Sequence, residues 1–280
     1  MLIAALGVLS LLAWLHPGQV PVQSRLSLTT VLFLFTVAAA GLGEPRQGWR
    51  YWAREFLPVP VLPFIFLSLG RLIPLLNPHI LDDLLLRVDA RLLGPEIQAA
   101  LYAIPLPGWL TEVLTLAYAS FFFLPVSLLV VLGLRRDPAL PRVAAAIVLT
   151  FLVSYAGYFF VPAYGPRATV AEERYLTLAP GVVGAQVRDL LDHWEKTKTD
   201  VFPSGHTMVT LAVLFCARRR SPVLYDVLLP VGSLLIAATV LLTYHYVVDL
   251  VAAVPLTALS LWVSARLAGP VPVRAPEVDV

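Results

Sequence analysis

The sequence predicts an all-α protein whose helices cross a lipid bilayer several times, as a polytopic membrane helix bundle. Two observations support this: 59% of the 280 residues are hydrophobic, and only 14% are charged. Soluble domains carry about 25% charged residues, so this chain cannot cover itself with polar surface. In lipid every backbone donor and acceptor must be paired within the protein, which leaves helices or closed barrels. Long continuous apolar runs, rather than short alternating strands, favour helices.

Eight apolar segments are candidates for these helices. A span needs about 20 apolar residues, within a range of about 17–25. We interpret the short first segment, which ends at a His16-Pro17-Gly18 turn, as a helix rather than a signal peptide. It lacks a basic n-region and a clear cleavage site. The eight segments are 2–15, 26–42, 57–76, 110–134, 142–162, 204–217, 223–243 and 247–267.

The arginines predict how the helices are oriented. With eight helices, one face receives most of the Arg-rich short loops, including the tight run Arg218–Arg220. Such loops lie on the cytoplasmic side, so both chain ends are expected there. The expected host bilayer is the cell membrane. The long segments 77–109 and 163–203 then lie on the extracytoplasmic side, and the Pro-rich residues 269–280 are expected to form a disordered cytoplasmic tail.

Two parts of the long outer segments are amphipathic. Residues 81–93 and 183–194 alternate apolar side chains with Asp and Arg at helical spacing. Helices of this kind lie in the membrane interface, or they form a lid that packs on other loops. The sequence leaves both interpretations open.

Composition restricts the partners and the redox chemistry. The net charge is +2 and no long basic run is present, so we expect no nucleic-acid partner. The single Cys216 rules out a disulfide within the chain and is expected to be a buried thiol on a helix. A lipid bilayer and a lipid are the partners expected.

The first polar cluster ends the fifth apolar segment. In Val161-Pro162-Ala163-Tyr164-Gly165-Pro166-Arg167, the prolines stop the helix and Gly165 permits a tight turn. Arg167 is thereby presented just beyond the membrane. A guanidinium has a planar fork of donors that suits phosphate, although an isolated arginine here also fits snorkelling to lipid head groups.

The second cluster is Phe202-Pro203-Ser204-Gly205-His206-Thr207, where the sixth segment begins. Proline is favoured in the first turn of a helix. The N–H groups of Ser204, Gly205 and His206 are then expected to form an anion site at the positive helix end. Glycine lets a ligand approach the backbone closely, and His206 can supply a proton.

The third cluster is Tyr244-His245-Tyr246-Val247-Val248-Asp249, between the seventh and eighth segments. His245 and Asp249 are four residues apart, so one helical turn places them on the same face. A carboxylate bound to one imidazole nitrogen fixes the tautomer and leaves the other nitrogen free to attack. A helix-end hydrogen bond without chemistry is the alternative.

The ordered motifs Pro203-Ser204-Gly205-His206 and His245-x-x-x-Asp249 resemble the second and third signatures of the type 2 phosphatidic acid phosphatase superfamily. The resemblance spans roughly residues 57–267 and is strongest to its inositol phosphorylceramide synthase-like branch. It implies a phosphatase-like core of six helices over residues 46–268, preceded by two additional transmembrane helices in residues 1–45. The superfamily's signatures also contain a Lys and an Arg that are absent here, where Phe160 and Thr239 stand, and Ala168 replaces the Pro after Arg167.

The resemblance implies that His245 is the nucleophile, Asp249 orients it, and His206 is the acid and base. Arg167, Ser204 and Gly205 are expected to bind the phosphate, with Lys196, Lys198 or Arg174 as candidates to replace the missing cations. The expected activity is hydrolysis of a lipid phosphate or pyrophosphate through a phosphohistidine, without a cofactor.

Three alternatives remain open. One is a phosphotransferase that moves a phospho-head group between lipids, as the inositol phosphorylceramide synthase-like branch does. Another, of a different class, is a proton-coupled transporter, whose ionisable residues should lie near the middle of helices. The third is a zinc site formed by His206, His245 and Asp249, against which the resemblance argues.

Overall fold

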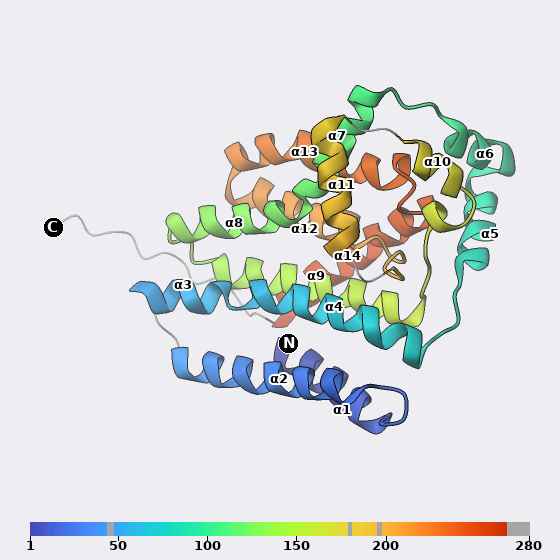
Figure 1. Ribbon diagram of the computed structural model, residues 1–280. Helices are drawn as coiled ribbons and strands as arrows, with labels where there is room; N and C mark the ends of the chain where they lie inside the picture. Colours follow the sequence, from blue (N-terminus) through green and yellow to red (C-terminus); the bar gives the residue numbers. More distant parts are fainter. Residues whose placement is uncertain (44–47, 179–180, 195–197, 268–280) are drawn as a thin grey trace.

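The computed structural model describes residues 1–43, 48–178, 181–194 and 198–267 (Figure 1). Every regular element in these ranges is a helix, which confirms the all-α prediction. Six helices there are long and apolar enough to cross a membrane, as expected of an integral multi-pass protein. The expected tail, residues 269–280, lies outside the described residues.

All eight predicted apolar segments form helices. Residues 110–134 are built from consecutive helices, and α3 precedes α4 in the candidate span Gly48–Leu76. The boundaries are α1 (Leu2–Leu15), α2 (Val22–Leu42), α3 (Gly48–Phe56) followed by α4 (Pro58–Leu76), α7 (Gly108–Ala119) followed by η1 (Ser120–Phe122) and α8 (Phe123–Leu134), α9 (Leu140–Phe160), α12 (Gly205–Arg220), α13 (Pro222–Leu241) and α14 (Val247–Leu267).

Helix α2 begins one turn earlier than the apolar pattern predicts. The pattern starts at residue 26, but the polar residues before it are still helical. The Arg25 guanidinium lies 4.8 Å from the centroid of the Trp14 ring in α1, and Thr29 accepts a hydrogen bond from the Trp14 Nε1 at 3.0 Å. These two contacts join α1 to α2, and the apolar pattern alone does not predict them.

The bundle is organised around α12. Its buried side chains occur on every side of the helix, as expected for a helix that is covered all round. Val209, Val213 and Ala217 pack into a core shared with α8, α9 and α13. The N-terminus of α12 carries the second polar cluster, so its surroundings decide the geometry of the site.

Among the described residues, five short elements lie outside the eight apolar segments. Figure 1 shows α5, α6 and α10 gathered at one end of the bundle, whereas the connection between α8 and α9 lies at the other end. Helix α11 runs across the bundle, where the Glu112 carboxylate of α7 accepts the Gly184 N–H at 3.0 Å. These elements are α5 (Asp82–Leu93), α6 (Pro95–Ala103), η2 (Pro166–Ala168), α10 (Glu172–Thr177) and α11 (Val182–Trp194).

Arginines and an aspartate hold the opposite end together. Asp137, between α8 and α9, forms an ion pair with Arg220 at the end of α12, and its carboxylate also accepts the Ala139 N–H just before α9 at 2.8 Å. Arg135 donates to the Ser221 hydroxyl at 3.0 Å. The loops that were expected to be cytoplasmic are therefore joined to each other.

Candidate active site

The structure brings the three polar clusters together at one end of the bundle. His206 is the second residue of α12, His245 lies in the loop between α13 and α14, and Asp249 lies in the first turn of α14. These three side chains are buried, with exposed fractions of 8%, 3% and 0%. The centroids of the two imidazole rings are 5.8 Å apart, so one small ligand can touch both rings.

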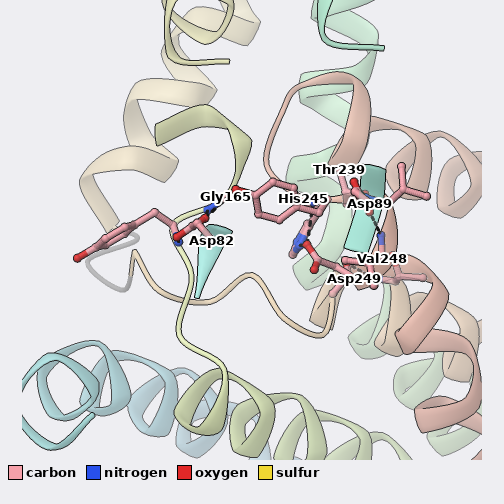
Figure 2. Close-up of polar contacts among 12 residues, drawn as sticks. Asp82, Asp89, Gly165, Thr239, His245, Val248 and Asp249 are labelled. Atoms are coloured by element: carbon pink, nitrogen blue, oxygen red, sulfur yellow. Dashed lines mark hydrogen bonds and ion pairs between the residues drawn. The ribbon is translucent and has the colours of Figure 1, made fainter. Parts of the chain in front are cut away.

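His245 is paired with Asp249, although not within a helical turn as the spacing suggested. Its Nδ1 lies 3.3 Å from the Asp249 Oδ2, which also accepts the Tyr246 N–H at 2.8 Å (Figure 2). The loop is closed from the other side by the Thr239 carbonyl, which accepts the Tyr244 and His245 N–H groups at 2.9 Å each. Asp249 thus caps α14 and fixes the imidazole with the same oxygen.

Stacked rings connect Arg167 to His206. The Arg167 guanidinium carbon lies 4.7 Å from the Tyr244 ring centroid. Tyr118 of α7 stacks on both Tyr244 and His206, with centroid distances of 4.4 Å in each case. No sequence motif indicated Tyr118, because a tyrosine in an apolar helix carries no signal of what it will pack against.

The start of α12 differs from the expectation in two respects. The Ser204 N–H, expected to face an anion, instead donates to the Asp249 carbonyl at 3.2 Å, while the Ser204 hydroxyl caps the helix by accepting the Thr207 N–H. Gly205 makes room for a side chain rather than a ligand, since a Cβ there would lie 2.1 Å from the Tyr158 hydroxyl. Within the described residues, the N–H groups of Gly205 and His206 make no hydrogen bond and remain suited to an anion.

Arg167 is presented by a turn that only glycine can form. Gly165 has φ +84, and a Cβ there would lie 2.5 Å from the Tyr244 carbonyl oxygen. The Arg167 N–H donates to the Thr243 carbonyl at 2.8 Å. The turn of the first cluster and the loop of the third are therefore in direct backbone contact.

Comparison with known proteins shows which family the chain belongs to. The model of a family described as the PAP2 superfamily matches residues 83–263, a range that contains all three clusters. The chain belongs to the PAP2 superfamily.

Part of the chain is also similar to a curated protein. A PA-phosphatase related-family protein of Dictyostelium discoideum is 28% identical over 169 residues, which cover 52% of this chain and 30% of that protein. The match thus spans less than a third of the relative's length. No solved structure matches the chain significantly.

This PAP2 superfamily member lacks two cations at the positions where its signatures place them. Phe160, at the end of α9, is 70% exposed, and Thr239 is buried with its carbonyl occupied by the His245 loop. Arg174 does not replace them, because its guanidinium donates to the Leu101 and Leu241 carbonyls at 2.7 and 3.0 Å. Lys198 is exposed, and Lys196 lies outside the described residues.

Asp200 is a site residue that sequence reasoning missed. It lies six residues before His206, is 8% exposed, and interacts electrostatically with Arg167 and His245. Burial raises the pKa of its carboxyl, while the Arg167 charge acts in the opposite direction. The only signal in the sequence was an acidic residue close to the second motif.

Burial also controls the protonation of His245. Desolvation lowers the pKa of its imidazole to about 4, although the Asp200 carboxylate and a hydrogen bond with the Val201 backbone oppose this effect. Because a histidine is neutral above its pKa, His245 carries no charge at neutral pH and retains a nitrogen lone pair.

An apolar cavity of 380 Å³ reaches the site from within the bundle. It is lined by α4, η1, α8 and α9, and extends from Glu55 to His206 and Asp200. Leu62, Phe66 and Ile147 are among the apolar side chains along it. His206 thus lies at one end of a space suited to a hydrocarbon chain.

The zinc alternative finds no support in the side-chain arrangement. Among the residues that the structure describes, no three His, Cys, Asp or Glu side chains are grouped as metal ligands. The Asp249 oxygen nearest to His245 is directed at the imidazole and a backbone N–H, an arrangement that orients the ring.

We predict that Gly165→Ala destabilises the protein and displaces Arg167. An L-residue in the left-handed region costs about 1–2 kcal/mol, and the Cβ also clashes with the Tyr244 carbonyl. Thermal unfolding in detergent measures the loss. Gly18→Ala is the control, because a Cβ there meets nothing within 4 Å; equal midpoints for the two variants would contradict the prediction.

We also predict that His245 stays neutral well below pH 6.5. Its lowered pKa means that protonation begins only as the pH approaches about 4. NMR titration of protein labelled at its histidines, assigned with His245→Gln, measures the midpoint. Asp200→Asn should move it lower still, because the carboxylate raises the pKa; a midpoint at 6.5 in the unmodified protein would refute the burial argument.

Proposed function

We propose that this protein is a membrane-embedded phosphatase that hydrolyses a lipid phosphate or pyrophosphate through a phosphohistidine intermediate. The observation that supports this best is the pair of buried imidazoles 5.8 Å apart. His245 is bound to a carboxylate, and His206 lies at the end of an apolar cavity. The name of the Dictyostelium discoideum relative refers to phosphatidic acid phosphatases, which is consistent with this activity.

In the first step, an unprotonated nitrogen of His245 attacks the phosphorus. The new N–P bond forms as the bond between phosphorus and the leaving oxygen breaks, and His206, which must be protonated for this step, gives that oxygen its proton. Asp249 stabilises the positive charge that develops on the His245 ring. Dividing one displacement into two is the usual gain of covalent catalysis.

In the second step, water attacks the phosphohistidine from the side that the leaving group vacated. His206, now neutral, takes a proton from this water as its oxygen bonds to phosphorus. The N–P bond breaks, inorganic phosphate leaves, and both histidines return to their starting protonation states. Acid and base assistance of this kind contributes about 10²–10⁴-fold in rate.

The phosphoryl oxygens require positive partners in both steps. Arg167, held against Tyr244, and the N–H groups of Gly205 and His206 are the groups that we assign to them. Donors that are fixed before the reaction stabilise developing charge without reorganising. In this proposal the Ser204 N–H takes no part, since it donates to Asp249.

The cavity supports a lipid as the substrate. Its walls are apolar, and it lies among helices α4, α8 and α9, whose segments are long and hydrophobic enough to cross a membrane. A substrate whose phosphate reaches His206 can therefore place a hydrocarbon chain in the cavity. Burial of apolar chain surface contributes about 25 cal/mol per Å².

We further propose that the site faces the extracytoplasmic side of the cell membrane. The arginines at the other end of the bundle, among them Arg135, Arg220 and Arg266, belong to short connections or helix ends. Short loops rich in arginine remain in the cytoplasm. The phosphate would then be released outside.

Phosphotransfer to an alcohol is the second candidate. Phe160 and Thr239 replace two cations of the signatures, and the inositol phosphorylceramide synthase-like branch has a similarly reduced set. An acceptor hydroxyl would replace water in the second step. Measuring free phosphate with and without an alcohol acceptor separates the two, because transfer lowers phosphate release as the phosphorylated acceptor accumulates.

A proton-coupled transporter fits the site less well. Such a protein needs ionisable groups along a path through the membrane, whereas His206, His245 and Asp249 lie together at helix starts or in the adjoining loop. A transporter would be the remaining candidate only if the purified protein never released phosphate.

We predict that His245→Ala abolishes phosphate release and that His206→Ala lowers it on the order of 10²–10⁴-fold, the range of acid–base catalysis. Orthovanadate, which adopts the trigonal-bipyramidal geometry of the transition state, should inhibit the unmodified protein. Release of phosphate from a lipid phosphate in detergent micelles is the measurement. His79→Ala is the matched control, because that histidine is exposed; turnover by folded His245→Ala would exclude this residue as the nucleophile.

We predict that Ala144→Phe impairs hydrolysis of long-chain lipid phosphates but not of p-nitrophenyl phosphate. Ala144 lines the cavity, and the larger ring fills space that the chain needs. The readout is the ratio of kcat/KM values for the two substrates. Val251→Phe, on an exposed face of α14, is the control; an equal loss for both substrates would argue against a chain in the cavity.

A further inference from the structure

Two aspartates of α5 are buried at the end of the bundle that carries the site. Asp82 is 6% exposed and Asp89 is 0% exposed, whereas Asp83 between them is exposed. Seven residues separate Asp82 from Asp89, about two helical turns, so both lie on the same face. A buried carboxylate is costly unless it is paired, and each has specific partners.

Asp82 holds the turn that leads to Arg167. Its Oδ2 accepts the Tyr164 N–H, and its Oδ1 accepts the Gly165 N–H, both at 2.8 Å. The same Oδ1 accepts the Tyr246 hydroxyl at 2.9 Å. One carboxylate therefore binds the arginine turn and the residue next to His245 (Figure 2).

Asp89 holds the start of α14. Its two oxygens accept the Val247 and Val248 N–H groups at 2.8 and 2.6 Å, as Figure 2 shows for Val248. The first N–H groups of a helix have no partner within it, and these two lie between His245 and Asp249 in the chain. Asp89 thus fixes the segment that sets the distance between the histidine and its carboxylate.

Asp82 contacts the turn before Arg167, and Asp89 contacts the start of α14. Asp82 and Asp89 belong to the same helix, so the positions of the arginine turn and of the His245 loop are set relative to each other. A further bond joins the loops directly, between Thr169 and the Tyr246 hydroxyl at 3.0 Å. Neither carboxylate hydrogen-bonds to the imidazoles or to the guanidinium among the contacts described.

We propose that Asp82 and Asp89 are positioning residues, and that α5 is the template that places the phosphate-binding Arg167 opposite the His245–Asp249 pair. This inference rests on the proposed function. It gives α5 a role in the reaction itself, beyond lying on the membrane surface or covering the site. Effective catalysis depends on such placement, and a displacement of about 1 Å costs on the order of 10²-fold in rate.

Asp82→Asn and Asp89→Asn test the proposal, with Asp83→Asn as the matched control on the exposed face of the same helix. An amide keeps the shape but replaces one acceptor oxygen by an NH₂ group that faces an N–H donor. We expect kcat for a lipid phosphate to fall about 10–100-fold in each variant, with KM within a factor of two, and no change for Asp83→Asn.

Hydrogen exchange of the full-length protein provides a readout that does not require turnover. Asp82→Asn should speed exchange at Tyr164 and Gly165, and Asp89→Asn at Val247 and Val248. Exchange elsewhere in the transmembrane helices should be unchanged. General unfolding would instead speed exchange throughout and would overturn a positioning role.

The outcomes separate this inference from the proposed function. If the unmodified protein hydrolyses lipid phosphates and both variants retain its kcat, the positioning role is wrong while the phosphatase proposal stands. If the unmodified protein releases no phosphate, the proposed function fails. Unchanged local hydrogen exchange in both variants would refute the positioning role of Asp82 and Asp89.

Discussion

Asp249 joins the two segments that carry the histidines. Its Oδ2 accepts from the His245 ring and from the Tyr246 N–H, and its backbone carbonyl accepts the Ser204 N–H at the start of α12. One buried residue therefore orients the proposed nucleophile, caps α14 and ties that helix to the loop before His206. If Asp249 were displaced, the 5.8 Å separation of the imidazoles would no longer be defined.

The hydrogen bonds around Asp249 are buried, and this burial affects both their strength and the cost of leaving a group unpaired. Bonds between polar groups are stronger where water is excluded, and an unpaired buried group is correspondingly costly. The site contains several carboxylates, of which Asp82 and Asp89 are satisfied by backbone N–H groups. Asp200 lies near Arg167 instead. Because backbone N–H groups pair with Asp82 and Asp89, these two carboxylates do not need the Arg167 guanidinium as a partner.

The sequence predicted the transmembrane helices well, because a long apolar run such as 142–162 has only one way to pair its backbone in lipid. It also indicated which segments would carry the site, since His206, His245 and Asp249 occur in recognisable motifs. It did not predict which backbone groups stay available for an anion. The Ser204 N–H was expected there, but its partner is a carbonyl 45 residues further along the chain.

The positioning residues were hidden for a different reason. Asp82 and Asp89 occur in an amphipathic pattern together with exposed charges, and the pattern alone does not say which aspartates are buried. Their partners are backbone N–H groups at positions 164, 165, 247 and 248, which have no side-chain signature. Tyr118 and Asp200 were missed likewise, since only the tertiary structure brings them to His206 and His245.

The most direct test of the central claim is to capture the covalent intermediate. Purified protein mixed with a lipid phosphate, quenched within milliseconds in alkali and digested, can be analysed by mass spectrometry for phosphate on nitrogen. The account predicts phosphate on His245 during turnover and no phosphohistidine in His245→Ala. Phosphate on another residue, or rapid turnover without any phosphohistidine, would contradict it.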